Sequence, residues 1–97
     1  MTVFVVLSGY DESYDVYKQQ YMDIYEGVVT SAEAAYDKAL SLALERKVQW
    51  EECYGDVKIY IQNDDTIKNA IPKGAIVVDA DCRTEAMWFY YKREELV

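Results

Sequence analysis

The sequence predicts an α+β domain in which a mainly antiparallel sheet of five to six strands packs one face against one main helix. Runs of β-branched and aromatic residues lie near both ends of the chain, and one alanine- and leucine-rich stretch of helical periodicity lies between them. The expected order is therefore strand, strand, helix and four further strands. A length of 97 residues suits one hydrophobic core, so residues 1–97 are expected to form a single compact domain.

The first strand is predicted over residues 2–8, where an uninterrupted apolar run indicates burial on both faces and a place inside the sheet. Turn-forming residues at 9–13 predict that the chain reverses there.

Two periodicities compete across residues 14–29. Tyrosines at steps of three and four fit a helix, whereas alternation and a composition rich in tyrosine, valine and isoleucine fit a strand. Because Gly27 would weaken a helix, we favour a strand over residues 20–29, with residues 11–19 as a loop or helical turn.

The helix is predicted to begin after Thr30, whose hydroxyl can form a capping box with Glu33. Its apolar stripe runs to about Lys47, and Arg46 and Lys47 then complement the negative end of the helix dipole in its last turn.

The rest of the chain is predicted to form two hairpins. Residues 48–54 and 57–61 alternate around a Gly-Asp turn, although the first of these segments could instead prolong the helix. Residues 66–70 fit a short helical turn that Pro72 would end. Residues 75–79 and 85–92 then form the final hairpin. With one helix, the second face of the sheet should be polar, dimeric or occupied by a partner.

Composition excludes several classes of function. A net charge of -8 and a pI near 4.4 argue against binding to nucleic acid or to anionic membranes, since both depend on lysine and arginine. The chain has no histidine, and neither of its two cysteines belongs to a CxxC pair. Phosphate-binding glycine motifs are missing as well. We therefore predict no catalytic residues, no metal and no cofactor, and a cytoplasmic location.

Tyrosines and acids are concentrated near the start of the chain, where lysine 18 is the one counter-charge. Tyrosine supplies rigid contact area at small entropic cost and is enriched at binding surfaces. The predicted partner-binding residues are Tyr10, Asp11, Glu12, Tyr14, Asp15, Tyr17, Asp23, Tyr25 and Glu26. An alternative is that part of this set is core, with only the hydroxyl groups in water.

Two other functions stay open at this level. An oligomer could hold a nucleotide by stacking on Tyr90, with Arg83 and Arg93 near the phosphates. The chain could also be a structural or assembly subunit, which predicts a stable homo-oligomer.

Residues 3–10, followed by residues 25–35, resemble small phage and prophage accessory proteins, which open strand, strand, helix with a Thr-Ser-x-Glu-Ala-like start to the helix. The resemblance covers about the first third of the chain. It implies a phage-encoded protein in the bacterial cytoplasm that blocks a host defence, either by occupying the DNA-binding surface of a nuclease or by trapping a nucleotide messenger. The leading hypothesis is therefore a non-enzymatic inhibitor that binds a basic surface of a host protein, as an acidic mimic of nucleic acid.

Overall fold

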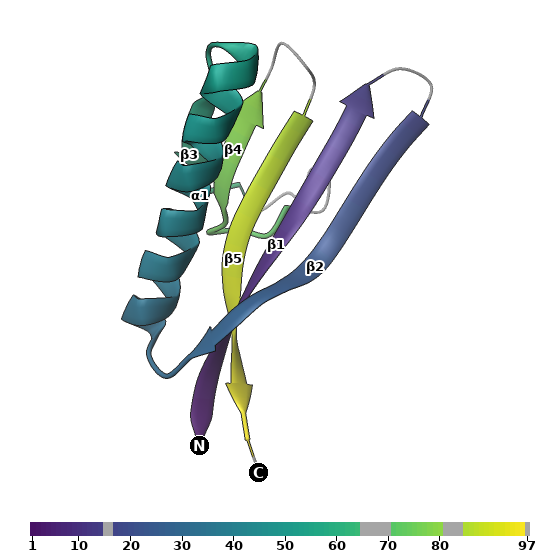
Figure 1. The fold of residues 1–97 in the computed structure, drawn as a ribbon. Helices are drawn as coiled ribbons and strands as arrows, with labels where there is room; N and C mark the ends of the chain where they lie inside the picture. Colours follow the sequence, from purple (N-terminus) through teal and green to yellow (C-terminus); the bar gives the residue numbers. More distant parts are fainter. Residues whose placement is uncertain (15–16, 65–70, 81–84, 97) are drawn as a thin grey trace.

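The computed structural model describes residues 1–14, 17–64, 71–80 and 85–96, and only the backbone of residues 12–14 and 17–22. Within these ranges the chain forms one helix and one five-stranded sheet (Figure 1). The elements are β1 (Thr2–Tyr14), β2 (Tyr17–Val29), α1 (Ala32–Tyr54), β3 (Lys58–Ile61), β4 (Ile76–Ala80) and β5 (Glu85–Glu95). All neighbouring strands are antiparallel, in the order β2-β1-β5-β4-β3. The predicted α+β class is confirmed.

The first two strands are longer than the sequence indicates. The predicted turn at residues 9–13 and the predicted loop at residues 11–19 are wrong, because β1 continues to Tyr14 and β2 begins at Tyr17. Gly9 serves close packing rather than a turn: a Cβ atom there would lie 2.2 Å from the ring of Trp88. The polar residues after it stay in the strand because β1 is paired with β2 on one side and with β5 on the other.

The helix differs from the prediction at both ends. Its N-cap is Ser31, whose Oγ accepts a hydrogen bond from the amide of Ala34 at 3.1 Å, so the capping box at Thr30 is wrong. At the other end α1 continues to Tyr54, and the predicted strand at residues 48–54 is wrong, whereas the alternative of a longer helix is confirmed. Burial of Trp50 explains the extension, because it continues the apolar face of the helix onto the sheet.

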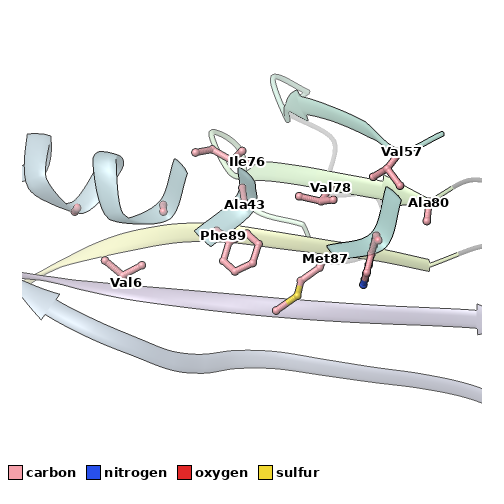
Figure 2. Packing of buried hydrophobic residues seen from close by; sticks show 11 residues of the cluster. Val6, Ala43, Val57, Ile76, Val78, Ala80, Met87 and Phe89 are labelled. Atoms are coloured by element: carbon pink, nitrogen blue, oxygen red, sulfur yellow. The ribbon is translucent and has the colours of Figure 1, made fainter. Parts of the chain in front are cut away.

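The main core lies between α1 and the sheet (Figure 2). Alanines on the helix allow close approach, and larger side chains of β4 and β5 fill the space beneath them. Its buried members are Val6, Ala35, Ala39, Ala43, Trp50, Val57, Ile76, Val78, Ala80, Met87 and Phe89. The helix therefore covers one face of the sheet, as predicted.

The opposite face carries a second apolar cluster, formed by Leu7, Ile71, Ala75, Val77, Trp88 and Tyr90. Trp88 is only 1% exposed. The chain between β3 and β4 contributes Ile71, and hydrogen bonds between Gln62 and residues 74 and 75 fasten its ends. The second face of the sheet was expected to be polar, dimeric or occupied by a partner. Over this cluster that expectation is wrong, because residues of the same chain, Ile71 among them, pack onto the face and bury it.

The predicted strand at 57–61 is confirmed, but its predicted hairpin with residues 48–54 is wrong, because β3 pairs with β4. The final hairpin of residues 75–79 and 85–92 is confirmed, with β5 extended to Glu95. The predicted helical turn at 66–70 lies outside the described residues. In the part of the chain that the structure describes, no helix combines the length and the apolar character needed to cross a bilayer.

Candidate protein-binding site

Several acidic residues meet at the end of the molecule where β5 begins. In the pairing of β1 with β5, Glu12 lies directly opposite Glu85, and Asp11 is opposite Ala86. Like charges directly opposite each other destabilise a sheet. Packing and strand pairing alone therefore do not account for this placement.

The C-terminus of α1 adds further negative charge at the same end (Figure 1). Glu51 and Glu52 lie in the last turn of the helix, all of whose residues are described, and none of them is basic. Asp56 follows the cap residue Gly55. The carbonyl end of a helix already carries a partial negative charge, so acids placed there raise the local negative potential. We call Asp11, Glu12, Glu51, Glu52, Asp56 and Glu85 the acidic end.

Within the described part of the chain, the acidic end takes part in one ion pair. Lys47 pairs with Glu51 at 2.9 Å, across one turn of the helix. Among the described residues no ion pair involves Asp11, Glu52, Asp56 or Glu85. Glu85 is also only 8% exposed. A strong negative field at one end of a domain attracts a cationic partner and speeds its association.

Aromatic side chains hold the acidic end in place. Tyr10 of β1 meets Trp50 of α1 edge-on, with ring centroids 6.3 Å apart, and Trp50 contacts Tyr54 at 6.2 Å. Tyr10 and Tyr54 are half-buried and Trp50 is buried. These contacts join the helix C-terminus to the strand that carries Asp11 and Glu12. Except for Asp56, which lies in the connection between α1 and β3, the acids are therefore carried by packed elements rather than by a loop.

The structure divides the predicted partner-binding residues into two groups. Tyr10, Asp11 and Glu12 lie at the acidic end, and the backbones of Tyr14 and Tyr17 pair where the β1–β2 hairpin closes. The side chains of Glu12, Tyr14 and Tyr17, and all of Asp15, lie outside the described part of the structure.

The second group lies in the middle of β2 and has structural contacts. Asp23 accepts a hydrogen bond from the hydroxyl of Tyr90 and lies 3.8 Å from the Nζ of Lys92. Glu26 accepts a hydrogen bond of 2.7 Å from the Oγ of Ser8. Tyr25, at 66% exposed, keeps a surface available for contact. Asp23 and Glu26 therefore take part in contacts between strands of the sheet and do not belong to the acidic end.

The residues predicted for a nucleotide are poorly arranged for that task. Tyr90 is 8% exposed and its hydroxyl donates to Asp23, so its ring offers no free face for stacking. Arg93 pairs with Glu95 at 3.0 Å, and Arg83 lies outside the described residues. A pocket of about 270 Å³ lies nearby, lined by Tyr36, Lys73 and Tyr91 among others. Its volume falls below the roughly 300–1,000 Å³ of typical small-molecule sites.

The sequence did not single out Glu51, Glu52, Asp56 and Glu85 as binding residues. Glu51 and Glu52 fall in the segment 48–54, which was predicted as a strand. Their position at the C-terminus of a helix was therefore not predicted. The signal was present, because two acids with no lysine or arginine in the following turn are unusual near the end of a helix.

Within the described residues no cluster of three histidine, cysteine, aspartate or glutamate side chains is placed to hold a metal ion. Comparison of the chain with protein-family models, with curated proteins and with solved structures found no match in any of the three.

Proposed function

We propose that this protein is a non-enzymatic binding protein that docks its acidic end onto a basic surface of another protein. The observation that carries the proposal is the placement of acidic residues of β1, of β5 and of the C-terminus of α1 at one end of the molecule. Glu12 and Glu85 occupy directly opposite positions in the sheet, where like charges are unfavourable, and Glu51 and Glu52 lie at the helix end that disfavours acids. A cationic partner would offset the repulsion among these acids. Binding therefore explains their position, whereas folding does not.

The proposed partner class is a nucleic-acid-binding protein of a bacterial host. Proteins that bind DNA or RNA present lysine and arginine along the path of the phosphates, and carboxylates on a rigid scaffold can occupy the same surface. The resemblance of residues 3–10 and 25–35 to phage accessory proteins supports a role in blocking a host defence. Activity of the partner would then fall because its nucleic-acid substrate is excluded.

Capture from a bacterial lysate, compared between matched charge variants, tests this function. One variant neutralises the acidic end with Glu12→Gln, Glu52→Gln and Asp56→Asn. The control neutralises three exposed acids elsewhere on α1, with Glu33→Gln, Asp37→Asn and Glu45→Gln. Both variants raise the formal net charge by three, from -8 to -5, so overall charge is matched.

The wild type and the control are expected to retain the same basic protein, and the acidic-end variant is expected to lose it. Nucleic acid added to the lysate should compete for the captured protein, since both would occupy its basic surface. Equal recovery with all three baits would rule out the acidic end as the binding surface.

A further inference from the structure

Strand β5 has an open side over its second half. Strand β4 begins at Ile76, which pairs with Phe89, whereas β5 continues to Glu95. On the other side β1 pairs with β5 along its whole length, from Glu85 to Glu95. Beyond Phe89, no described segment pairs with the side of β5 that faces away from β1.

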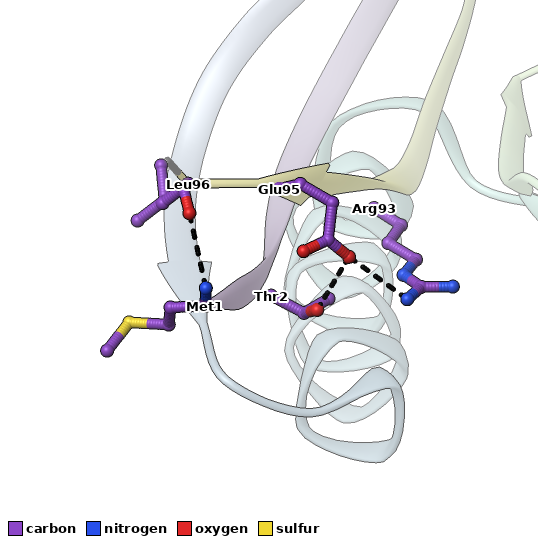
Figure 3. Close-up of polar contacts among 5 residues, drawn as sticks. All are labelled: Met1, Thr2, Arg93, Glu95 and Leu96. Carbon is purple, nitrogen blue, oxygen red and sulfur yellow. Dashed lines mark hydrogen bonds and ion pairs between the residues drawn. The ribbon is translucent and has the colours of Figure 1, made fainter.

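Hydrogen bonds at the end of the sheet fix which residues face this open side. Leu96 donates its amide to the carbonyl of Met1 at 2.7 Å and accepts from the Met1 amino group at 3.2 Å (Figure 3). Leu96 therefore directs both backbone groups toward β1. Because successive residues of a strand direct these groups to opposite sides, Tyr91, Arg93 and Glu95 direct theirs to the open side.

The open side of β5 is more regular than the other long edge of the sheet. On β2 the pairing shifts twice, opposite Val6/Leu7 and Ser8/Tyr10, and Asp23 adopts a φ of 55°. Bulges of this kind discourage the addition of another strand. In contrast, β5 keeps one continuous register with β1 from end to end. An added strand therefore finds a suitable template on β5.

We propose that a second copy of this chain adds to the open side of β5, so that the two β5 strands pair antiparallel about a two-fold axis at Arg93. In this register Tyr91 faces Glu95 of the second copy, and Arg93 faces its own equivalent. It is the alignment in which all three outward-facing residues of both copies exchange backbone hydrogen bonds. An axis at position 92 would place Glu95 opposite Phe89, which already pairs with Ile76, and an axis at position 94 would place Tyr91 opposite residue 97, so only the axis at Arg93 pairs the three residues with one another.

Charge complementarity favours the same partner. The edge residues Lys92, Arg93, Glu94 and Glu95 sum to zero charge, although the whole chain carries -8. With the axis at Arg93, Lys92, which also lies 3.8 Å from Asp23 of its own chain, faces Glu94 of the second copy, and this pair occurs twice. The two Arg93 side chains meet at the axis, but each is already paired with its own Glu95 at 3.0 Å. An axis at position 92 would instead oppose two lysines, and one at position 94 two glutamates.

The surroundings of the edge fit this arrangement. The pocket lined by Tyr36, Lys73 and Tyr91 lies on the helix side of β5, where Glu95 of the second copy would enter. Antiparallel pairing also directs the two acidic ends away from each other, because each lies at the beginning of its own β5. Self-association therefore avoids the strongest repulsion in the molecule and yields a bivalent acidic protein.

Measurement of molar mass against concentration, by light scattering or sedimentation, tests the proposal. The wild type is expected to approach about twice the 11.3 kDa of one chain. Arg93→Pro should remain a monomer, because proline removes an outward amide that β1 does not use. Arg93→Ala is the matched control: it loses the same side chain but keeps the backbone, so it should still dimerise.

A charge exchange tests the register and does not depend on how well the proline variant folds. Lys92→Glu and Glu94→Lys should each weaken the dimer by about tenfold or more, since each creates two like-charge pairs across the axis. The two changes together should restore association. A wild type that stays monomeric at every concentration overturns the proposal. So does an Arg93→Pro variant that is folded and dimerises normally, or a double exchange that keeps the fold of the wild type and fails to restore association.

Discussion

At the scale of single residues, Asp23 connects the irregular middle of β2 to the rest of the sheet. Its φ of 55° lies in the left-handed region, which a short polar side chain tolerates better than most. Its carboxylate accepts a hydrogen bond from the hydroxyl of Tyr90 and lies near Lys92, so both contacts come from β5 across the intervening β1.

Tyr90→Phe tests the contribution of this contact. Loss of the hydroxyl leaves the Asp23 carboxylate without its neutral donor, and we expect the free energy of unfolding to fall by about 1–2 kcal/mol. Tyr25→Phe is the control, because that ring is 66% exposed and its loss of a hydroxyl should change stability by less than about 0.5 kcal/mol. Urea denaturation of both variants measures the difference. Equal stability of the two would show that the Asp23 contact contributes nothing.

Gly9 is required by packing against Trp88. A Cβ atom would meet three atoms of the indole at 2.2 to 2.4 Å, and Trp88 is 1% exposed and has little room to move. Gly9→Ala should therefore lower stability by about 1–3 kcal/mol. In a double-mutant cycle, Trp88→Phe should relieve part of this loss by removing ring atoms at the contact. Additive effects of the two substitutions would contradict the proposed clash.

At the scale of elements, α1 carries acids at both ends, and only those at its N-terminus favour the helix. Glu33 lies in the first turn, where an acid complements the helix dipole, whereas Glu52 lies in the last turn, where it opposes the dipole. Opposite effects are therefore expected from the same substitution at the two positions.

Glu52→Lys should raise the free energy of unfolding by about 0.3–1 kcal/mol and weaken partner binding. Glu33→Lys should lower stability by a similar amount and leave binding unchanged. Thermal denaturation at low ionic strength measures whether each substitution raises or lowers the stability of the protein. If Glu52→Lys instead destabilises the chain, the acid contributes to folding, and the argument that its position serves binding fails.

The sequence was sufficient for the fold class and for most strands, because hydrophobic alternation and composition determine which segments enter the sheet. It was insufficient where a long-range contact decides the local conformation. Gly9 resembles a turn residue until Trp88, far away in sequence, is placed against it. Residues 48–54 alternate as a strand does, yet burial of Trp50 on the sheet keeps them helical.

The candidate site was predicted in part for the same reason. Tyr10, Asp11 and Glu12 are adjacent in sequence, so their cluster is visible without a structure. Glu85 joins them only through strand pairing, and Glu52 only through the length of α1. Asp23 and Glu26 share the composition of the cluster, but hydrogen bonds to Tyr90 and Ser8 place them in the body of the sheet.

At the scale of the whole molecule, charge is distributed unevenly along the sheet. The acidic end collects carboxylates from three elements, whereas the opposite end of β5 is neutral and has an open edge. A partner of positive charge is expected at the first end and a second copy of the chain at the other. The two surfaces are far apart in β5, so variants at Arg93 should not change the intrinsic affinity of one acidic end for its partner.

The most direct measurement is the affinity of the captured partner for the wild type and for the two matched charge variants, over a range of salt concentrations. Neutralising Glu12, Glu52 and Asp56 should weaken binding by about 10- to 100-fold and flatten its dependence on salt. Neutralising Glu33, Asp37 and Glu45 should change affinity by less than about threefold. Equal losses in the two variants would contradict the acidic end as the binding surface, because net charge alone would then explain the attraction.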